Sequence, residues 1–208
     1  MFKVGSKLGT DLNVSRETMD RLKLFEGLVL KWSGAINLIS NRDQNKVWVR
    51  HILDSMQIYP LLPGKLDSYV DFGAGGGFPG LVLAILLDGD GRRTEVYLVE
   101  SDKRKSAFLR NANRELGLSV SVYDSRIESV TLPRIDLVTA RALAPLDTLL
   151  KLSSAHINKS TICIFPKGRV WKKDVENARK QWNFELKVIK SKTQAGAVIL
   201  KMGSISCA

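Results

Sequence analysis

Cysteine is scarce in this chain of 208 residues, which has two cysteines and two histidines in all. Cys163 lies in the apolar run TICIFPK, and Cys207 lies in what we expect to be a frayed C-terminal tail. Two such distant cysteines form neither a disulfide framework nor a metal cluster. We therefore expect reduced thiols and no metal.

Long apolar runs are also missing. The longest, residues 78–87, contains Pro79 and Gly80 and is far shorter than the roughly 20 residues that span a bilayer. The N-terminal stretch MFKVGSKLGTDLNV lacks the apolar core and small-residue cleavage site of an export signal. We expect a cytoplasmic protein without a membrane segment.

Acidic residues are outnumbered, because 32 Lys and Arg face 21 Asp and Glu and leave a net charge of +11. The excess is uneven, since residues 165–208 contain ten basic and three acidic side chains. Such a segment favours a polyanionic partner such as nucleic acid. A solubilising surface explains the same charge, and only a spatial cluster decides between the two.

The spacing of apolar residues divides the chain into two parts. Residues 15–33 have apolar side chains at three- and four-residue steps behind the N-cap candidate Ser15, which predicts an amphipathic helix. A second helix is expected after Asp43 and ends at Pro60. We interpret residues 1–64 as a helical cap that belongs to the same compact unit as residues 65–208.

From residue 65 onward, short β-rich runs alternate with helical segments, and two β-rich runs close the chain without a helix between them. Alternation predicts a parallel sheet, and a closing hairpin requires antiparallel pairing. The expected fold is α/β with a seven-stranded, mostly parallel sheet and an antiparallel last strand. The expected strands are 69–72, 95–99, 119–123, 135–139, 161–165, 184–190 and 197–202; the expected helices are 79–87, 102–116, 145–155 and 171–181.

The stretch DFGAGGGFPG, residues 71–80, connects the first expected strand to a helix. Such a glycine-rich turn brings backbone N–H groups and the positive end of a helix to a ligand. Asp71, Gly73, Gly75 and Gly77 form D-x-G-x-G-x-G, and Phe78 stands where the dinucleotide fingerprint has glycine. An acid at the mouth favours a cationic aminoacyl sulfonium over a pyrophosphate. A tight turn whose glycines serve packing is the alternative.

Two further acidic positions complete a nucleoside site. Glu100 ends the strand VYLVES, where an acid can accept hydrogen bonds from both ribose hydroxyls of S-adenosylmethionine or of NAD. Asp102 is better explained as the N-cap of the next helix. After the third strand, Asp124 and the 127–128 peptide are candidates for the adenine edge.

Six motifs in order resemble those of the RsmG (GidB) family of bacterial small-subunit rRNA methyltransferases, over residues 15–202. They are NLIS at 37–40, VRHILDSM at 49–56, DFGAGGGFPG at 71–80, SRIE at 125–128, TARALAPL at 139–146 and FPKG at 165–168. The resemblance implies a Rossmann-like class I fold, S-adenosylmethionine as cofactor, and methylation of N7 of a guanine in the 530 loop of 16S rRNA. The implied partner is 16S rRNA or the small ribosomal subunit, and we expect a monomer.

The resemblance also implies roles for individual positions. Catalytic positions around cofactor and RNA are Asn37, His51, Arg141 and Lys167. Gly73, Phe78, Ile127, Glu128 and Arg141 would bind the cofactor, beside Asp71, Gly75, Gly77, Glu100 and Asp124. Expected RNA contacts come from Arg126, Lys167, Arg169, Lys172 and Lys173. Two small departures from the family pattern, Ile39 and Ala140, remove no charged group.

The residues also restrict the chemistry. Methylation of a pyrimidine carbon needs a thiolate nucleophile, but Cys163 lies mid-strand and Cys207 near the terminus. Methylation of an exocyclic amine commonly uses an [N/D]-P-P-[Y/F] loop, and TARALAPL stands in its place. Guanine N7 carries an unprotonated lone pair and needs no base.

Two alternatives stay open: a methyltransferase for another acceptor, and a non-catalytic rRNA-binding assembly factor. His51 and Asp54 also have a purely structural explanation. On a helix, His51 can pair with Ser55, and Arg50 can pair with Asp54.

Overall fold

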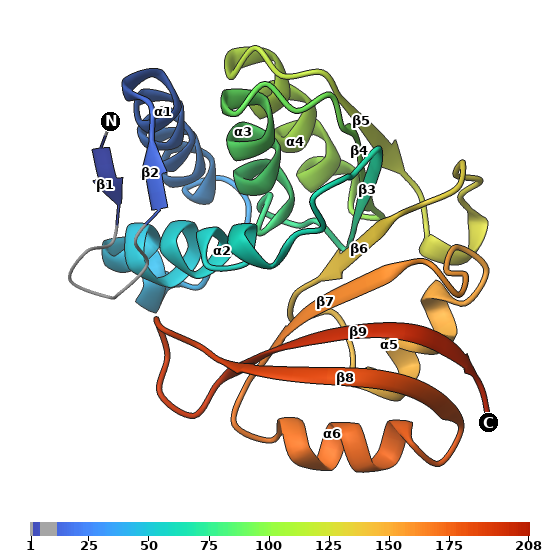
Figure 1. The fold of residues 1–208 in the computed structure, drawn as a ribbon. Helices are drawn as coiled ribbons and strands as arrows, with labels where there is room; N and C mark the ends of the chain where they lie inside the picture. Colours follow the sequence, from blue (N-terminus) through green and yellow to red (C-terminus); the bar gives the residue numbers. More distant parts are fainter. Residues whose placement is uncertain (1, 5–11) are drawn as a thin grey trace.

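The computed structural model describes residues 2–4 and 12–208 and is built around one seven-stranded sheet (Figure 1). Its strand order is β5-β4-β3-β6-β7-β9-β8. Strands β3 to β7 pair in parallel, and β9 lies between β7 and β8 and is antiparallel to both. The predicted sheet with an inverted last strand is confirmed.

The elements of the sheet region follow the predicted order. The strands are β3 (Ser68–Phe72), β4 (Glu95–Glu100), β5 (Val120–Asp124), β6 (Leu137–Ala140), β7 (Ile162–Lys167), β8 (Trp182–Lys190) and β9 (Val198–Cys207). The helices are α3 (Gly80–Gly89), α4 (Lys103–Glu115), α5 (Leu146–Ser153) and α6 (Trp171–Ala178). Asp102 caps α4 as predicted, because its side chain accepts from the N–H groups of Arg104 and Lys105.

The N-terminal part agrees with the prediction in one helix and differs in the next. Helix α1 (Arg16–Ser33) begins at Ser15, whose hydroxyl accepts from the Thr18 N–H. The second helix is not one regular α-helix: it consists of a 3-10 segment, a π-helical segment, the short α2 and a second 3-10 turn. These are η2 (Asn41–Lys46), η3 (Trp48–Leu53), α2 (Asp54–Met56) and η4 (Tyr59–Leu61). Periodicity of apolar residues does not distinguish these windings.

A short antiparallel pair, β1 (Phe2–Val4) and β2 (Leu12–Val14), precedes α1 and was not predicted. The sequence MFKVGSKLGTDLNV gave no alternation strong enough to indicate it, and residues 1 and 5–11 lie outside the described ranges. The boundary at residue 64 between cap and sheet domain stays a prediction.

The core has two apolar clusters, one on each face of the sheet. Helices α1, α3 and α4 cover one face, and α5 and α6 cover the other (Figure 1). Phe25 of α1 is fully buried, and its ring centroid lies 5.2 Å from that of Phe78. The cap is therefore packed directly against the glycine-rich loop. Burying such a ring stabilises the fold by roughly 1.5–3 kcal/mol.

Cys163 is buried in β7, and Cys207 is exposed at the end of β9. The expected frayed tail is wrong, because β9 pairs with β8 as far as Cys207. None of the helices in the described ranges combines the length and apolarity needed to cross a membrane.

A buried carboxylate fixes the loop after β3. Asp71 is 1% exposed; its Oδ2 accepts from the Gly80 N–H at 3.0 Å, and its Oδ1 accepts from the Thr139 hydroxyl at 2.6 Å. Thr139 is the register partner of Asp71 on β6, so the bond follows from strand pairing. A Cβ on Gly80 would lie 2.7 Å from Asp71 Oδ2 and 2.5 Å from Leu98 Cδ2. Glycine is therefore required where α3 begins.

The surroundings of Asp71 have opposing effects on its protonation. Burial raises the pKa of Asp71 to about 7, although the hydrogen bonds from Thr139 and Gly80 lower it. Desolvation dominates because the carboxylate is buried.

We expect Asp71→Asn to change the pH dependence of the unfolding free energy. The folded pKa of Asp71, about 7, exceeds the ordinary 3.8, so its contribution to stability falls as pH rises between these values. His51 acts in the opposite sense, because its folded pKa of about 4 lies below the ordinary 6.5. The variant loses the Asp71 contribution and keeps that of His51. Its stability should therefore rise with pH relative to the unmodified chain, by about 1.4 kcal/mol for each pKa unit removed.

Urea unfolding of both proteins at several pH values measures this difference. Asp67→Asn, at an exposed aspartate in the preceding loop, is the control and should run parallel to the unmodified chain. A constant offset between Asp71→Asn and the unmodified chain at every pH would contradict the raised pKa.

Candidate active site

A cavity of about 440 Å³ lies at the carboxyl ends of four neighbouring strands. Residues 73–76 follow β3, Glu100 and Ser101 end β4, residues 125–128 follow β5, and residues 141–143 follow β6. Ligands of open α/β sheets bind at this edge. We refer to this space as the first cavity.

Glu100 forms one wall of the first cavity and is held by the backbone. Its Oε2 accepts from the Gly75 N–H at 2.9 Å, and its Oε1 accepts from the Asp102 N–H at 2.8 Å. A carboxylate has about four acceptor positions, so each oxygen can accept one further hydrogen bond. The side chain is thereby oriented for a ligand with two neighbouring hydroxyl groups.

The glycines of the loop have two different tasks. Gly73, Gly75 and Gly76 line the first cavity, and Leu143 stands over Gly73, where a Cβ would lie 2.7 Å from its Cδ1. Gly77 does not line the cavity. A Cβ there would lie 2.8 Å from Leu81 and 2.9 Å from Phe25. Packing within the protein therefore explains the glycine at position 77. Room for a ligand explains the glycines at 73, 75 and 76, so the two explanations of the loop apply to different positions.

His51 and Phe78 lie together beside this cavity. Their ring centroids are 4.9 Å apart, and both side chains line the cavity. Arg141 Nη1 lies 3.0 Å from His51 Nδ1. A guanidinium can only donate, so Nδ1 accepts and the imidazole proton resides on Nε2. Burial and the charge of Arg141 lower the pKa of His51 to about 4, which keeps the ring neutral near pH 7.

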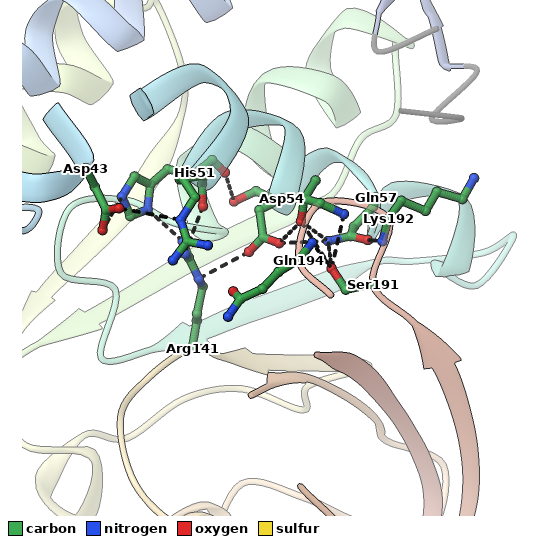
Figure 2. A network of polar contacts seen from close by, with 11 residues as sticks. Asp43, His51, Asp54, Gln57, Arg141, Ser191, Lys192 and Gln194 are labelled. Carbon is green, nitrogen blue, oxygen red and sulfur yellow. Dashed lines mark hydrogen bonds and ion pairs between the residues drawn. The ribbon is translucent and has the colours of Figure 1, made fainter. Parts of the chain in front are cut away.

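Arg141 connects the loop after β6 to the N-terminal segment (Figure 2). Its Nη2 donates to the Arg50 carbonyl oxygen at 3.0 Å, and its Nε lies 3.4 Å from Asp54 Oδ2. Burial lowers the pKa of Arg141, and the Asp54 carboxylate opposes that effect. Asp43 lies on the other side of His51, with its Oδ2 3.8 Å from Nε2.

A second cavity of about 230 Å³ adjoins the first and shares Arg141 and Ala142 with it. Lys167 contributes to its wall and is held in place, because its Nζ donates to the Ala144 carbonyl oxygen at 2.8 Å and lies 3.2 Å from Asp174 Oδ2. Asp54 and Gln57 also line this cavity.

Several predicted site residues do not reach either cavity. Asp71 lies beneath the loop with both oxygens engaged, and Gly77 is enclosed by apolar side chains. Asp124 and Asn37 are exposed and line neither space. The predicted residues that do line the first cavity are Gly73, Gly75, Phe78, Glu100, Ile127, Glu128, His51 and Arg141.

The predicted RNA contacts separate into three positions. Arg126 is exposed and lines the first cavity, whereas Lys167 is enclosed in the second. Arg169, Lys172 and Lys173 are exposed where β7 leads into α6. The last three form a cluster on one short segment, which we call the 169–173 patch.

Sequence reasoning missed the residues that support Arg141. Asp54 lies in the motif VRHILDSM but was weighed only as a helix pair, and Gln57 follows the motif directly. Residues 191–197, between β8 and β9, carried no signal, because contact across such sequence distances cannot be read from local pattern. In the described ranges, no cluster of His, Cys, Asp and Glu has the composition of a metal site.

The comparisons agree with this geometry. A model of the GidB family, described as rRNA small subunit methyltransferase G, matches residues 18–199. Ribosomal RNA small subunit methyltransferase G of Ruegeria sp. (strain TM1040) is 47% identical over 195 residues, which cover 94% of this chain and 95% of that one. The protein of the same name from Bartonella tribocorum is 44% identical over 195 residues, 93% and 91% of the two chains.

Solved structures of lower identity share the fold. A ribosomal protein L11 methylase from Lactobacillus delbrueckii subsp. bulgaricus has a TM-score of 0.60 at 14% identity and 80% coverage of both chains. A SAM-dependent methyltransferase from Aquifex aeolicus has a TM-score of 0.57 at 15% identity, covering 79% of this chain and 94% of that one. With the sequence match spanning nearly all of the chain, the protein belongs to the RsmG (GidB) family, that of rRNA small subunit methyltransferase G.

Proposed function

We propose that this protein transfers a methyl group from S-adenosylmethionine to N7 of a guanine in the 530 loop of 16S rRNA. The family match over residues 18–199 carries the proposal. We further propose that it acts as a monomer in the cytoplasm.

The first cavity fits S-adenosylmethionine by the chemistry of its walls. Glu100 has free acceptor positions for two ribose hydroxyls, and the loop at residues 73–76 leaves room because it carries almost no side chains. Ile127 and Glu128 would border the adenine, and Phe78 would border the apolar part of the ligand. When bound, the cofactor supplies a sulfonium methyl group that an unprotonated ring nitrogen can accept without a base.

The side chains around the cavities favour positioning over proton transfer. His51 is neutral and its Nδ1 is occupied by Arg141, while Asp71 is sealed beneath the loop. Neither side chain is placed as a general base for an acceptor. Holding acceptor and donor in line can contribute as much as about 7–11 kcal/mol in favourable cases. We therefore assign His51 to holding Phe78 and Arg141, and Asp71 to holding the loop.

The direct test is methylation of rRNA by the purified protein. Small subunits and deproteinised 16S rRNA from cells that lack the gene are incubated with isotopically labelled S-adenosylmethionine, and nucleosides are analysed by mass spectrometry. We expect labelled N7-methylguanosine in 16S rRNA. Label on another nucleoside would favour a methyltransferase for another acceptor, and absence of cofactor binding at millimolar concentration would favour the assembly factor.

We expect Glu100→Gln to weaken binding of S-adenosylmethionine. The change removes the charge and one acceptor oxygen, and hydrogen bonds to charged groups contribute about 1.5–3 kcal/mol, which corresponds to a dissociation constant about 10- to 150-fold higher. Isothermal titration calorimetry measures this dissociation constant. Glu95→Gln, the same change at the opposite end of β4, is the matched control and should bind like the unmodified protein. Equal affinity in all three proteins would remove Glu100 from the cofactor site.

We expect the 169–173 patch to contribute to RNA affinity through phosphate contacts. Replacing Arg169, Lys172 and Lys173 by alanine should weaken binding and flatten its salt dependence by about 0.7 in log–log slope for each lost phosphate contact on a single strand. Fluorescence anisotropy with a 16S rRNA fragment at several salt concentrations measures the slope. Alanine at Arg16, Lys23 and Lys31 of α1 removes the same charge from another face. If both triple variants lose the same slope, net charge rather than this patch governs binding.

A further inference from the structure

The second cavity is the feature that the cofactor site leaves unexplained. Its wall is built from segments far apart in the sequence. The lining residues are Asp54 and Gln57 of the cap, Arg141, Ala142 and Ala144 after β6, residues 166–168, and Ser191, Gln194 and residues 197–199. We infer that this cavity receives the acceptor guanine base, and that the turn between β8 and β9, residues 191–197, forms its outer wall. The inference rests on the proposed function and names the place of the acceptor.

Position singles out this cavity. It shares Arg141 and Ala142 with the first cavity, so a base in it would lie next to a cofactor held in the first cavity. Two other hollows in the described part of the chain share no lining residue with the first cavity. One lies near Asp67 and Arg134, before the amino ends of the strands, and the other lies near Arg21 and Asp88. Neither can present a substrate to the cofactor.

The hydrogen-bond donors of the cavity match a guanine. Arg141 has five N–H groups, of which three meet His51, the Arg50 carbonyl oxygen and Asp54. Lys167 has three, of which two meet Ala144 and Asp174. Two donors on Arg141 and one on Lys167 therefore remain. Next to N7, guanine has the acceptor O6 where adenine has an amine donor. Cationic donors thus favour guanine, provided that they meet O6 and leave N7 free.

The turn is tied by hydrogen bonds to Gln57 and Asp54 (Figure 2). Gln57 Oε1 accepts from the Lys192 N–H at 2.9 Å, and Gln57 Nε2 lies 3.2 Å from the Ser191 hydroxyl. Thr193 donates its hydroxyl to Asp54, the same carboxylate that pairs with Arg141. The turn is therefore tied to the residue that holds Arg141.

Gln194 is the side chain that this turn contributes to the wall without another partner. Its backbone N–H donates to Ser191, and its amide group lines the cavity with no hydrogen bond among the described residues. An amide offers both a donor and an acceptor, so it can meet the Watson–Crick edge of a base whose O6 faces Arg141 and Lys167.

Gly168→Leu tests the cavity by filling it. A Cβ at Gly168 meets nothing within 4 Å, so a leucine adds bulk at this lining position without a clash at its Cβ. Because misplacement of a reactant by about 1 Å can cost a hundredfold in rate, we expect kcat/KM for 16S rRNA methylation to fall by about that factor. The dissociation constant for S-adenosylmethionine, measured by calorimetry, should stay unchanged. Gly64→Leu makes the same change at another open position and should leave both quantities unchanged.

Ala197→Leu fills the same cavity from the turn and guards against a folding defect in the first variant. Both filled variants should bind S-adenosylmethionine as tightly as the unmodified protein but methylate 16S rRNA poorly. Gln194→Ala should raise KM for rRNA more than it lowers kcat. Full methylation by either filled variant would overturn the inference. If the unmodified protein methylates no guanine in 16S rRNA, the proposed function fails instead, which is a distinguishable result.

Discussion

The pairing of the Arg141 guanidinium with the N-terminal segment is the contact on which both cavities depend. Arg141 extends from the end of β6 to Asp54, the Arg50 carbonyl oxygen and His51, and thereby forms the wall between the two spaces. The Arg141 and Asp54 side chains are 21% and 14% exposed, so removing either one leaves a largely enclosed charge without its partner, which destabilises the fold. The cap, the loop after β6 and the turn between β8 and β9 therefore hold one another in place.

The same contact determines what the site can do chemically. Burial and the charge of Arg141 lower the pKa of His51 and keep its ring neutral. Arg141 also occupies Nδ1, so the imidazole that lines the cavity is not free for acid–base work. A site of this kind favours an acceptor that needs no deprotonation. The proposed N7 acceptor and the arrangement of Arg141 and His51 thus support each other from independent starting points.

The sequence predicted the sheet well because strand–helix alternation is a local pattern that tertiary contacts reinforce. It predicted the first cavity through Gly73, Phe78 and Glu100, which sit at strand ends that the fold brings together. The cofactor role of Asp71 stays a prediction, and the structure shows both of its oxygens bonded within the protein. The contact of Asp54 with Arg141 was missed, because a carboxylate that pairs within the protein and one that binds a ligand look alike in a sequence. The β8–β9 turn could not be found, because its role comes from contacts with Gln57, more than a hundred residues earlier.

Ala142 shows how the wall between the cavities is maintained. It has a φ of 53°, in the left-handed region that disfavours residues with a Cβ. Such a conformation costs of order 1–3 kcal/mol and persists only where the surroundings impose it. Here Arg141 on one side is held by Asp54, and Leu143 on the other packs over Gly73. Ala142 lies between these two fixed neighbours, which impose its backbone conformation. The strain at Ala142 is thus the consequence of one short loop serving two cavities at once.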